Sequence, residues 1–233
     1  MTIEPIAYFK SPFADKFGIP RQSGLVPGLR GEIHFVEKYR RGEAVRGLEG
    51  FDYLWLIWGF SANRQDPARQ WQPTVRPPRL GGNARLGVFA TRSPFRPNPL
   101  GLSSVRIERI DFDCPDAPVI HVLGADLMDG TPIYDIKPYV PYADSHPEAA
   151  GGFTDDKDWE PLKVAVPDDI RTLLERHLGP DGLEALVGVL SQDPRPHYQD
   201  DPARLYGMVY SGLDIHFKAE TGFLTVTGFE VVD

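Results

Sequence analysis

The run Tyr53-Leu-Trp-Leu-Ile-Trp-Gly-Phe60 decides how the first two thirds of this chain are interpreted. It consists almost entirely of residues that favour β-strands, and Gly50 and Ser61 bound it on either side. A short apolar run between turn signals is typical of a strand inside a core. We therefore predict a central strand over residues 53–60 that is buried on both faces.

Further short strands are predicted on both sides of this run. Stretches rich in β-branched and aromatic residues alternate with Gly, Pro, Asn and Asp, which end strands. The expected strands are residues 3–9, 32–36, 86–90, 102–112, 119–125 and 133–139, with a helical turn at 43–48. Turn signals every dozen or so residues are the pattern of a small barrel or a sandwich, so this region should be mainly β.

The same region lacks the pattern of a nucleotide-binding α/β domain. No helical pattern alternates with the strands, and no Gly-x-Gly-x-x-Gly motif opens a helix. Both features are needed for a Rossmann-type cofactor domain, which is therefore not expected.

The composition changes after residue 142, where a small, polar and acidic stretch begins. We predict a first domain over 1–142, a linker over 143–166 and a smaller α+β domain over 167–233. In this smaller domain, a helix begins at Asp168 and stops at Gly179, and a second follows from Asp181. Strands are expected at residues 205–210, 213–219 and 223–232.

Composition excludes several classes of protein. No apolar run is long enough to cross a bilayer, and no export signal begins the chain, so a cytoplasmic protein without a membrane partner is expected. Cys114 is the only cysteine, which rules out disulfides and cysteine-held zinc within the chain. No His-x-x-x-His or similar spacing is present, and no metal site is predicted.

The net charge of −8 hides a segregation of charge along the chain. Residues 64–109 carry nine arginines and two acidic residues, whereas residues 110–233 carry eight basic and twenty-four acidic ones. Arginines concentrated in one segment indicate a local site for a phosphate or carboxylate partner. The alternative, that they pair with carboxylates of the last third, is equally compatible with the sequence.

Residues 76–104 hold five of these arginines and no acidic residue. In Arg92-Ser-Pro-Phe-Arg-Pro-Asn-Pro99 the prolines fix the backbone, so Arg92, Arg96 and Asn98 should point in definite directions. A guanidinium held in this way suits a carboxylate, a phosphate or the face of a base. For either arginine, an ion pair that ties the loop down is the alternative.

Two aspartates flank a turn predicted at Asp129-Gly130. Either could accept a hydrogen bond from a ribose hydroxyl or an amine, but we expect Asp129 to cap its own turn and leave the role of Asp126 open. No serine lies in a nucleophile-elbow signature, so hydrolase chemistry is not supported.

Several longer motifs make the chain recognisable. They are Pro20-Arg-Gln22, Val45-Arg-Gly-Leu-Glu49, Phe51-x-x-Leu-Trp55, Arg76-Pro-Pro-Arg-Leu-Gly-Gly-Asn-Ala-Arg85, Gly87-Val-Phe-Ala-Thr-Arg-Ser93, Phe95-Arg-Pro-Asn-Pro99, Asp129-Gly-Thr-Pro-x-x-Asp-Ile-Lys-Pro-Tyr139 and Asp193-Pro-Arg-Pro-x-Tyr198. Together they resemble the TrmO family, whose members have a TsaA-like or YaeB-like domain and methylate N6 of threonylcarbamoyladenosine at position 37 of tRNA.

The resemblance implies a single-sheet β-barrel, S-adenosyl-L-methionine as cofactor, and a homodimer with cofactor sites near the subunit interface. Carried over by position, the cofactor contacts would be Arg21, Gln22, Ser23, Ser61, Ala62, Arg92, Leu102, Asp126, Leu127, Met128, Asp129, Gly130 and Thr131. Many relatives have Phe-His where this chain has Phe60-Ser61-Ala62, so the role of that histidine does not transfer.

The resemblance also suggests roles for the candidate catalytic residues. We expect Arg92 or Arg96 to hold a carboxylate of the cofactor or of the substrate, and Asp126 to accept a hydrogen bond from N6 or from the cofactor ammonium. The remaining arginines would meet phosphates of the anticodon loop. The alternative is a non-catalytic β-barrel module that binds tRNA or a nucleotide through the Arg-rich face.

Overall fold

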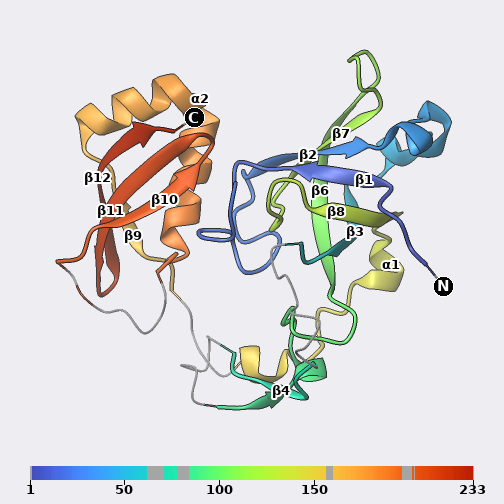
Figure 1. The fold of residues 1–233 in the computed structure, drawn as a ribbon, viewed down its shortest axis with the longest axis horizontal. Helices are drawn as coiled ribbons and strands as arrows, with labels where there is room; N and C mark the ends of the chain where they lie inside the picture. The colour runs from blue at the N-terminus through green and yellow to red at the C-terminus, as the bar shows by residue number, and fades with distance from the viewer. Residues whose placement is uncertain are drawn as a thin grey trace.

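The computed structural model describes residues 2–61, 71–77, 84–155, 160–195, 201 and 203–232. Two bodies lie side by side, a larger one built from the N-terminal region of the chain and a smaller one built from the C-terminal region (Figure 1). A small hairpin lies below both of them in this view. The prediction of a mainly β protein with a smaller C-terminal region of helix and strand is confirmed.

The larger body is one antiparallel sheet. Its strands are β1 (Ala7–Lys10), β2 (Arg30–Phe35), β3 (Tyr53–Gly59), β6 (Leu100–Asp111), β7 (Val119–Leu123) and β8 (Pro132–Pro138). The strands follow the order β1-β2-β7-β6-β3-β8, and β8 pairs again with β1, so that the sheet forms a closed barrel. Three short 3-10 turns, η1 (Glu37–Tyr39), η2 (Gly42–Val45) and η3 (Leu48–Gly50), connect β2 to β3.

The strand β3 is buried on one face only. Leu54, Leu56 and Trp58 lie in the core, whereas the alternate residues Trp55 and Ile57 are partly exposed. In a closed sheet only one face points inward, and among the described residues none covers the outward face of β3 completely. The prediction that this strand is buried on both faces is therefore wrong.

A bulge in β6 changes which residues face the core. The pairing of β6 with β7 shifts between Ile107 and Arg109, which inserts one residue into the alternation. As a result, Ile107 and Ile110 both pack against the barrel core. Without the bulge, strict alternation along the strand would put these two isoleucines on opposite faces.

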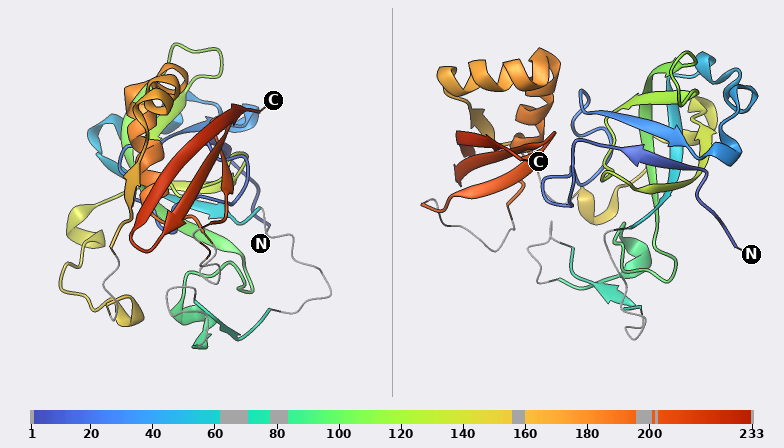
Figure 2. Two further views of the ribbon diagram at one scale, coloured as in Figure 1. Left: turned by 90° about the vertical axis from the view of Figure 1, so that its left-hand side faces the viewer. Right: turned by 45° about the horizontal axis from the view of Figure 1, so that its top comes forward.

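The segment predicted as a strand over 86–90 is mostly not one. Only Leu86–Gly87 (β5) pairs with Thr74–Val75 (β4), and residues Val88–Ala90 (η5) form a 3-10 turn. Val88 is buried in this turn, whereas Phe89 is exposed. The pair β4–β5 is the small hairpin that projects beyond the two bodies in each view (Figures 1 and 2).

The smaller body is a four-stranded sheet packed against a long helix. The elements are β9 (Lys163–Ala165), α2 (Asp168–Ser191), β10 (Tyr206–Tyr210), β11 (Leu213–Glu220) and β12 (Phe223–Val231), in the strand order β10-β11-β12-β9. The helix α2 is broken at Gly179, which has φ 71°, so the two predicted helices are its two halves. The strand β9 lies in the segment expected to be a linker and pairs in parallel with β12.

Between the two bodies the chain forms two further short elements, α1 (Pro141–Asp144) and η6 (Gly152–Thr154). Trp55 on β3 donates from Nε1 to Asp144 Oδ2 over 3.0 Å, which fixes α1 against the barrel. None of the helices in the described ranges is both long and apolar enough to cross a membrane.

The loop between β1 and β2 belongs to both bodies. Phe13, Val26 and Leu29 come from this loop, yet they are buried in the hydrophobic core of the C-terminal body. On the other side, Gly24 N–H donates to the Gly124 carbonyl of the barrel over 2.8 Å. Figure 1 shows the loop running between the barrel and the C-terminal sheet.

Close backbone approaches fix this loop. Gly18 has φ 86° and faces Met208, whose Sδ would be 2.1 Å from a Cβ at that position. Gly188 on α2 leaves room for Val26, whose Cγ1 would be 2.9 Å from a Cβ there. A side chain larger than glycine would displace the loop at either point, so its path depends on the C-terminal core.

Candidate functional site

Asp126 lies at the centre of a chain of hydrogen bonds that begins inside the barrel. Trp58 Nε1 donates to Ser103 Oγ over 2.9 Å, and the Ser103 hydroxyl donates to Asp126 Oδ1 over 2.5 Å. The Trp58 ring lies against Gly101, where a Cβ would come within 2.2 Å of it. Strands β3 and β6 therefore determine the orientation of the Asp126 carboxylate.

Burial raises the pKa of the Asp126 carboxyl above its usual value. Four groups act in the opposite direction and stabilise the ionised form: the Ser103 hydroxyl, the backbone of Asp126 itself, the charge of Arg92 and the backbone of Ser23. Burial is the larger effect, so the carboxylate carries a desolvation cost. A bound cation would recover part of this cost.

Arg92 connects the Arg-rich stretch to the loop that follows β1. Its Nη1 donates to Gln22 Oε1, and its charge is close enough to lower the pKa of Asp126. The backbone of Ser23, next in the same loop, also contacts Asp126. Three segments that are far apart in the sequence thus meet here, and we refer to Gln22, Ser23, Arg92, Ser103 and Asp126 as the Asp126 cluster.

Arg96 has a different role from Arg92. Its Nη1 donates to the carbonyls of Thr91 and Ser93, over 3.0 and 3.2 Å. These bonds close the turn in which Arg96 itself lies. The structure therefore agrees with the tie-down alternative for this arginine, although carbonyls rather than a carboxylate accept the bonds.

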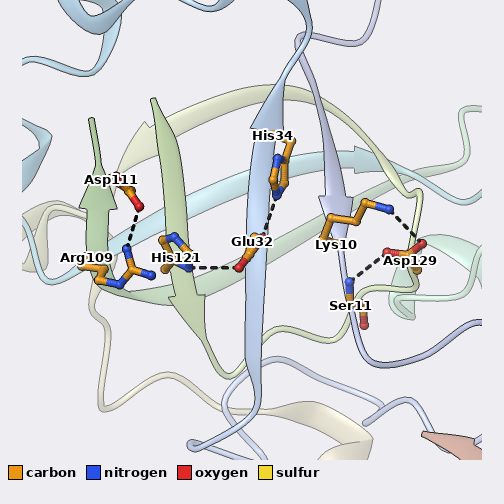
Figure 3. Close-up of polar contacts among 8 residues, drawn as sticks. All are labelled: Lys10, Ser11, Glu32, His34, Arg109, Asp111, His121 and Asp129. Carbon is orange, nitrogen blue, oxygen red and sulfur yellow. Dashed lines mark hydrogen bonds and ion pairs between the residues drawn. The ribbon is translucent and has the colours of Figure 1, made fainter. Parts of the chain in front are cut away.

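Asp129 contacts the end of β1. Its carboxylate accepts from Ser11 N–H over 3.1 Å and lies 3.6 Å from Lys10 Nζ, as Figure 3 shows. Both partners are at the end of β1. The expectation that Asp129 caps its own turn is therefore wrong, because its carboxylate holds the neighbouring segment instead.

The other predicted contacts differ in exposure. Leu127 and Thr131 are buried, Leu102 is 54% exposed, and Met128 is partly buried. Arg21, Gly130 and Ser61 are exposed, while Ala62 lies outside the described residues. Only some residues of the run 126–131 can therefore offer a side chain to a ligand.

A cavity of about 630 Å³ separates the barrel from the C-terminal body, and Asp129 is one of its lining residues. Its charges are largely paired: Arg30 contacts both Glu108 and Asp181 over 3.0 Å. Glu32 contacts His34 and His121 over 2.7 and 3.3 Å (Figure 3). Asp126 does not line this cavity, and no group of three or more metal-ligating side chains is found in the ranges that the structure describes.

Sequence reasoning missed Ser103 and Trp58 as members of the site. On β6 the inward positions are Gly101, Ser103 and Val105. A serine among inward-facing residues of a strand needs a hydrogen-bond partner, and that signal could have identified Ser103. Trp58 is harder to find, because a buried tryptophan is by itself only a core residue.

Two successive parts of the chain match two family profiles. The profile described as the tRNA-methyltransferase O N-terminal domain covers residues 8–145, and the one described as the TrmO C-terminal domain covers residues 159–232. The chain belongs to the TrmO family. The resemblance seen in the sequence motifs is thereby confirmed.

A curated relative and a solved structure are similar to this chain over nearly its full length, and a third protein is similar over the N-terminal part. The tRNA (adenine(37)-N6)-methyltransferase of Escherichia coli K12 is 41% identical, covering 98% of this chain and 95% of its own. A crystal structure of TrmO from Pseudomonas aeruginosa is 32% identical with a TM-score of 0.77, covering 99% of this chain and 98% of that one. A probable S-adenosyl-L-methionine-binding protein of Methanothermobacter thermautotrophicus is 35% identical, over 61% of this chain and 93% of its own.

Proposed function

We propose that this TrmO-family protein transfers a methyl group from S-adenosyl-L-methionine to N6 of threonylcarbamoyladenosine at position 37 of tRNA. The observation that carries the proposal is the near full-length similarity to an enzyme named for methylation of adenine 37. The Asp126 cluster supports it, because its charges match those of an amino-acid ligand.

The residues of the cluster fit the cofactor. The amino-acid moiety of S-adenosyl-L-methionine carries an ammonium and a carboxylate. Asp126 would hold the ammonium, which recovers the cost of burying its own carboxylate, and the exposed Arg92 would hold the carboxylate. Gln22 orients Arg92, and Leu102 offers exposed apolar surface.

When bound, the cofactor supplies a methyl group on a positively charged sulfur. Transfer of such a group is an in-line displacement, so the protein contributes mainly by holding the reacting atoms in line. The bonds from Trp58 to Ser103 and from Ser103 to Asp126 fix the rotamer of Asp126 from inside the barrel. Arg96 keeps its turn rigid, which in turn directs Arg92.

We propose the anticodon loop as the region of tRNA that this protein binds. The support is the segregation of charge, since residues 64–109 carry nine arginines while the rest of the chain is acidic overall. Contacts to phosphates make affinity fall as the salt concentration rises. We further propose a cytoplasmic homodimer with cofactor sites near the subunit interface, as the family resemblance implies.

Labelled S-adenosyl-L-methionine and tRNA from a strain that lacks the modification test the reaction directly. We expect label at position 37 of tRNAs that contain threonylcarbamoyladenosine. The matched control is tRNA without the threonylcarbamoyl group, which should stay unlabelled. Binding of tRNA without any transfer of label would instead favour the non-catalytic module.

A further inference from the structure

Two large aromatic side chains are exposed together on the β4–β5 hairpin. Trp71 is 47% exposed and Phe89 is 71% exposed. Their ring centroids are 5.9 Å apart and the ring planes are tilted by 35°. Aromatic residues of this size usually bury most of their surface, so an exposed pair indicates a surface that meets a partner.

The hairpin holds the two rings on a braced backbone. Val88 N–H donates to the Pro73 carbonyl over 2.9 Å, next to the ladder between β4 and β5. Val88 is buried and anchors the turn that presents Phe89. The rings are therefore presented in a defined arrangement, which lowers the entropy lost when a ligand binds.

The segment that carries the pair has basic but no acidic side chains. Arg76 and Arg85 are exposed on the hairpin, and the sequence has no acidic residue between Trp71 and Ile107. Other exposed arginines do form ion pairs, as in the contact of Arg30 with Glu108. Within the described ranges, no carboxylate forms an ion pair with Arg76 or Arg85.

The hairpin is rigidly joined to the Asp126 cluster. The Thr91 hydroxyl donates to the Val88 carbonyl over 2.9 Å, and Ser93 N–H donates back to Thr91 Oγ1 over 3.3 Å. These bonds fix the path from Phe89 to Arg92. A ligand bound by Phe89 would therefore contact a segment that lies only three residues before Arg92, the residue that would hold the cofactor carboxylate.

We propose that Trp71 and Phe89 form a stacking platform for unpaired bases of the anticodon loop, with Arg76 and Arg85 contacting the adjacent phosphates. Single-stranded RNA is recognised mainly by stacking of splayed bases on aromatic side chains. The inference rests on the proposed function, and it names the region of the protein that holds the bases near the target adenosine. A second copy of the chain is a poorer occupant, because two such faces would bring arginines together.

The substitutions Trp71→Leu and Phe89→Leu test the platform, since each removes a ring but keeps an apolar side chain. Affinity is measured by fluorescence anisotropy with a labelled anticodon stem-loop that carries threonylcarbamoyladenosine. We expect each substitution to weaken binding by roughly 5- to 150-fold, which corresponds to about 1–3 kcal/mol for one stacked base. Phe89→Trp should restore affinity, and calorimetric binding of S-adenosyl-L-methionine should not change.

Phe112→Leu is the matched control. Phe112 is 46% exposed and directly follows β6, a strand whose last residues lie on the far side of the barrel from the hairpin in Figure 1. This substitution should leave RNA affinity unchanged. Arg85→Gln should reduce the steepness of the plot of log affinity against log salt concentration by about one, the amount expected for one phosphate contact. Loss of an aromatic ring would not change this slope.

Unchanged stem-loop affinity in both leucine variants would overturn the proposal. So would a change in oligomeric state by light scattering without a change in RNA affinity, since a second copy would then cover the rings. Failure of the proposed reaction is separable from both results. In that case wild-type protein would bind the stem-loop through the rings but transfer no methyl group.

Discussion

Replacement of Val26 by Ala should weaken cofactor binding, although Val26 is not a member of the Asp126 cluster. Val26 is 4% exposed and packs in the C-terminal core. It lies three residues after Ser23, on the loop that also carries Gln22. Loss of its packing should therefore loosen the loop where the loop reaches Asp126.

The size of the effect follows from the atoms removed. The substitution deletes two buried methyl groups, worth about 0.8 kcal/mol each in transfer free energy, and leaves a small cavity. We expect the free energy of unfolding to fall by about 2 kcal/mol. If the whole of this free energy is lost from the docking of the loop against the core, the affinity for the cofactor falls by at most about 30-fold.

The assay compares Val26→Ala with Val226→Ala. Val226 is 0% exposed and belongs to the same core, but it lies on β12 and not on the loop. Both substitutions should lower the free energy of unfolding in urea to a similar extent. Only Val26→Ala should raise the dissociation constant for S-adenosyl-L-methionine measured by calorimetry.

Equal loss of cofactor affinity in the two variants would refute this reasoning, because it would show that general destabilisation is enough. Unchanged affinity in Val26→Ala, despite the expected loss of stability, would refute it as well. In that case the C-terminal core would not position the loop.

Three further predictions concern single side chains. Because burial raises the pKa of Asp126, its ionisation costs stability as pH rises above the unfolded-state value of 3.8. At pH 7 the Asp126→Asn variant should therefore be at least as stable towards urea as wild type. Any gain in its free energy of unfolding should disappear below pH 3.8, where the carboxyl is protonated in both states. Calorimetry should show that the variant binds the cofactor about tenfold more weakly, or weaker still. Trp58→Phe removes the donor to Ser103 and should lower the free energy of unfolding in urea by about 1 kcal/mol. It should also weaken cofactor binding several-fold. Unchanged cofactor binding would show that the bond from Trp58 to Ser103 does not contribute to the site. Burial raises the pKa of Tyr210 from 10.0 to about 12, so wild type should lose up to about 3 kcal/mol relative to Tyr210→Phe as pH rises from 9 to 12, measured by urea unfolding at each pH.

Much of the β architecture could be predicted because alternation and turn residues are local signals. The strands β2, β7, β8, β11 and β12 lie within two residues of their predicted bounds. The errors arose where long-range pairing decides the outcome. A closed sheet leaves one face of β3 outward, a bulge turns Ile110 inward, and β9 is a strand because β12 lies beside it.

The candidate site was predictable in composition but not in arrangement. The sequence motifs identified Gln22, Arg92 and Asp126 before any geometry was known. They did not show that Asp129 would point towards Lys10 or that Ser103 would support Asp126. These outcomes depend on which strands become neighbours, and a pattern along one chain does not contain that information.

The shared loop also has a consequence for the order in which the protein matures during translation. Phe13 packs edge-on against Tyr210, with ring centroids 5.5 Å apart, although nearly the whole chain separates them. At about 5–20 residues per second, roughly 10 to 40 seconds pass between synthesis of the loop and of its partner strands. The barrel strands emerge early, but the loop between β1 and β2 can reach its final position only when the last strands leave the ribosome.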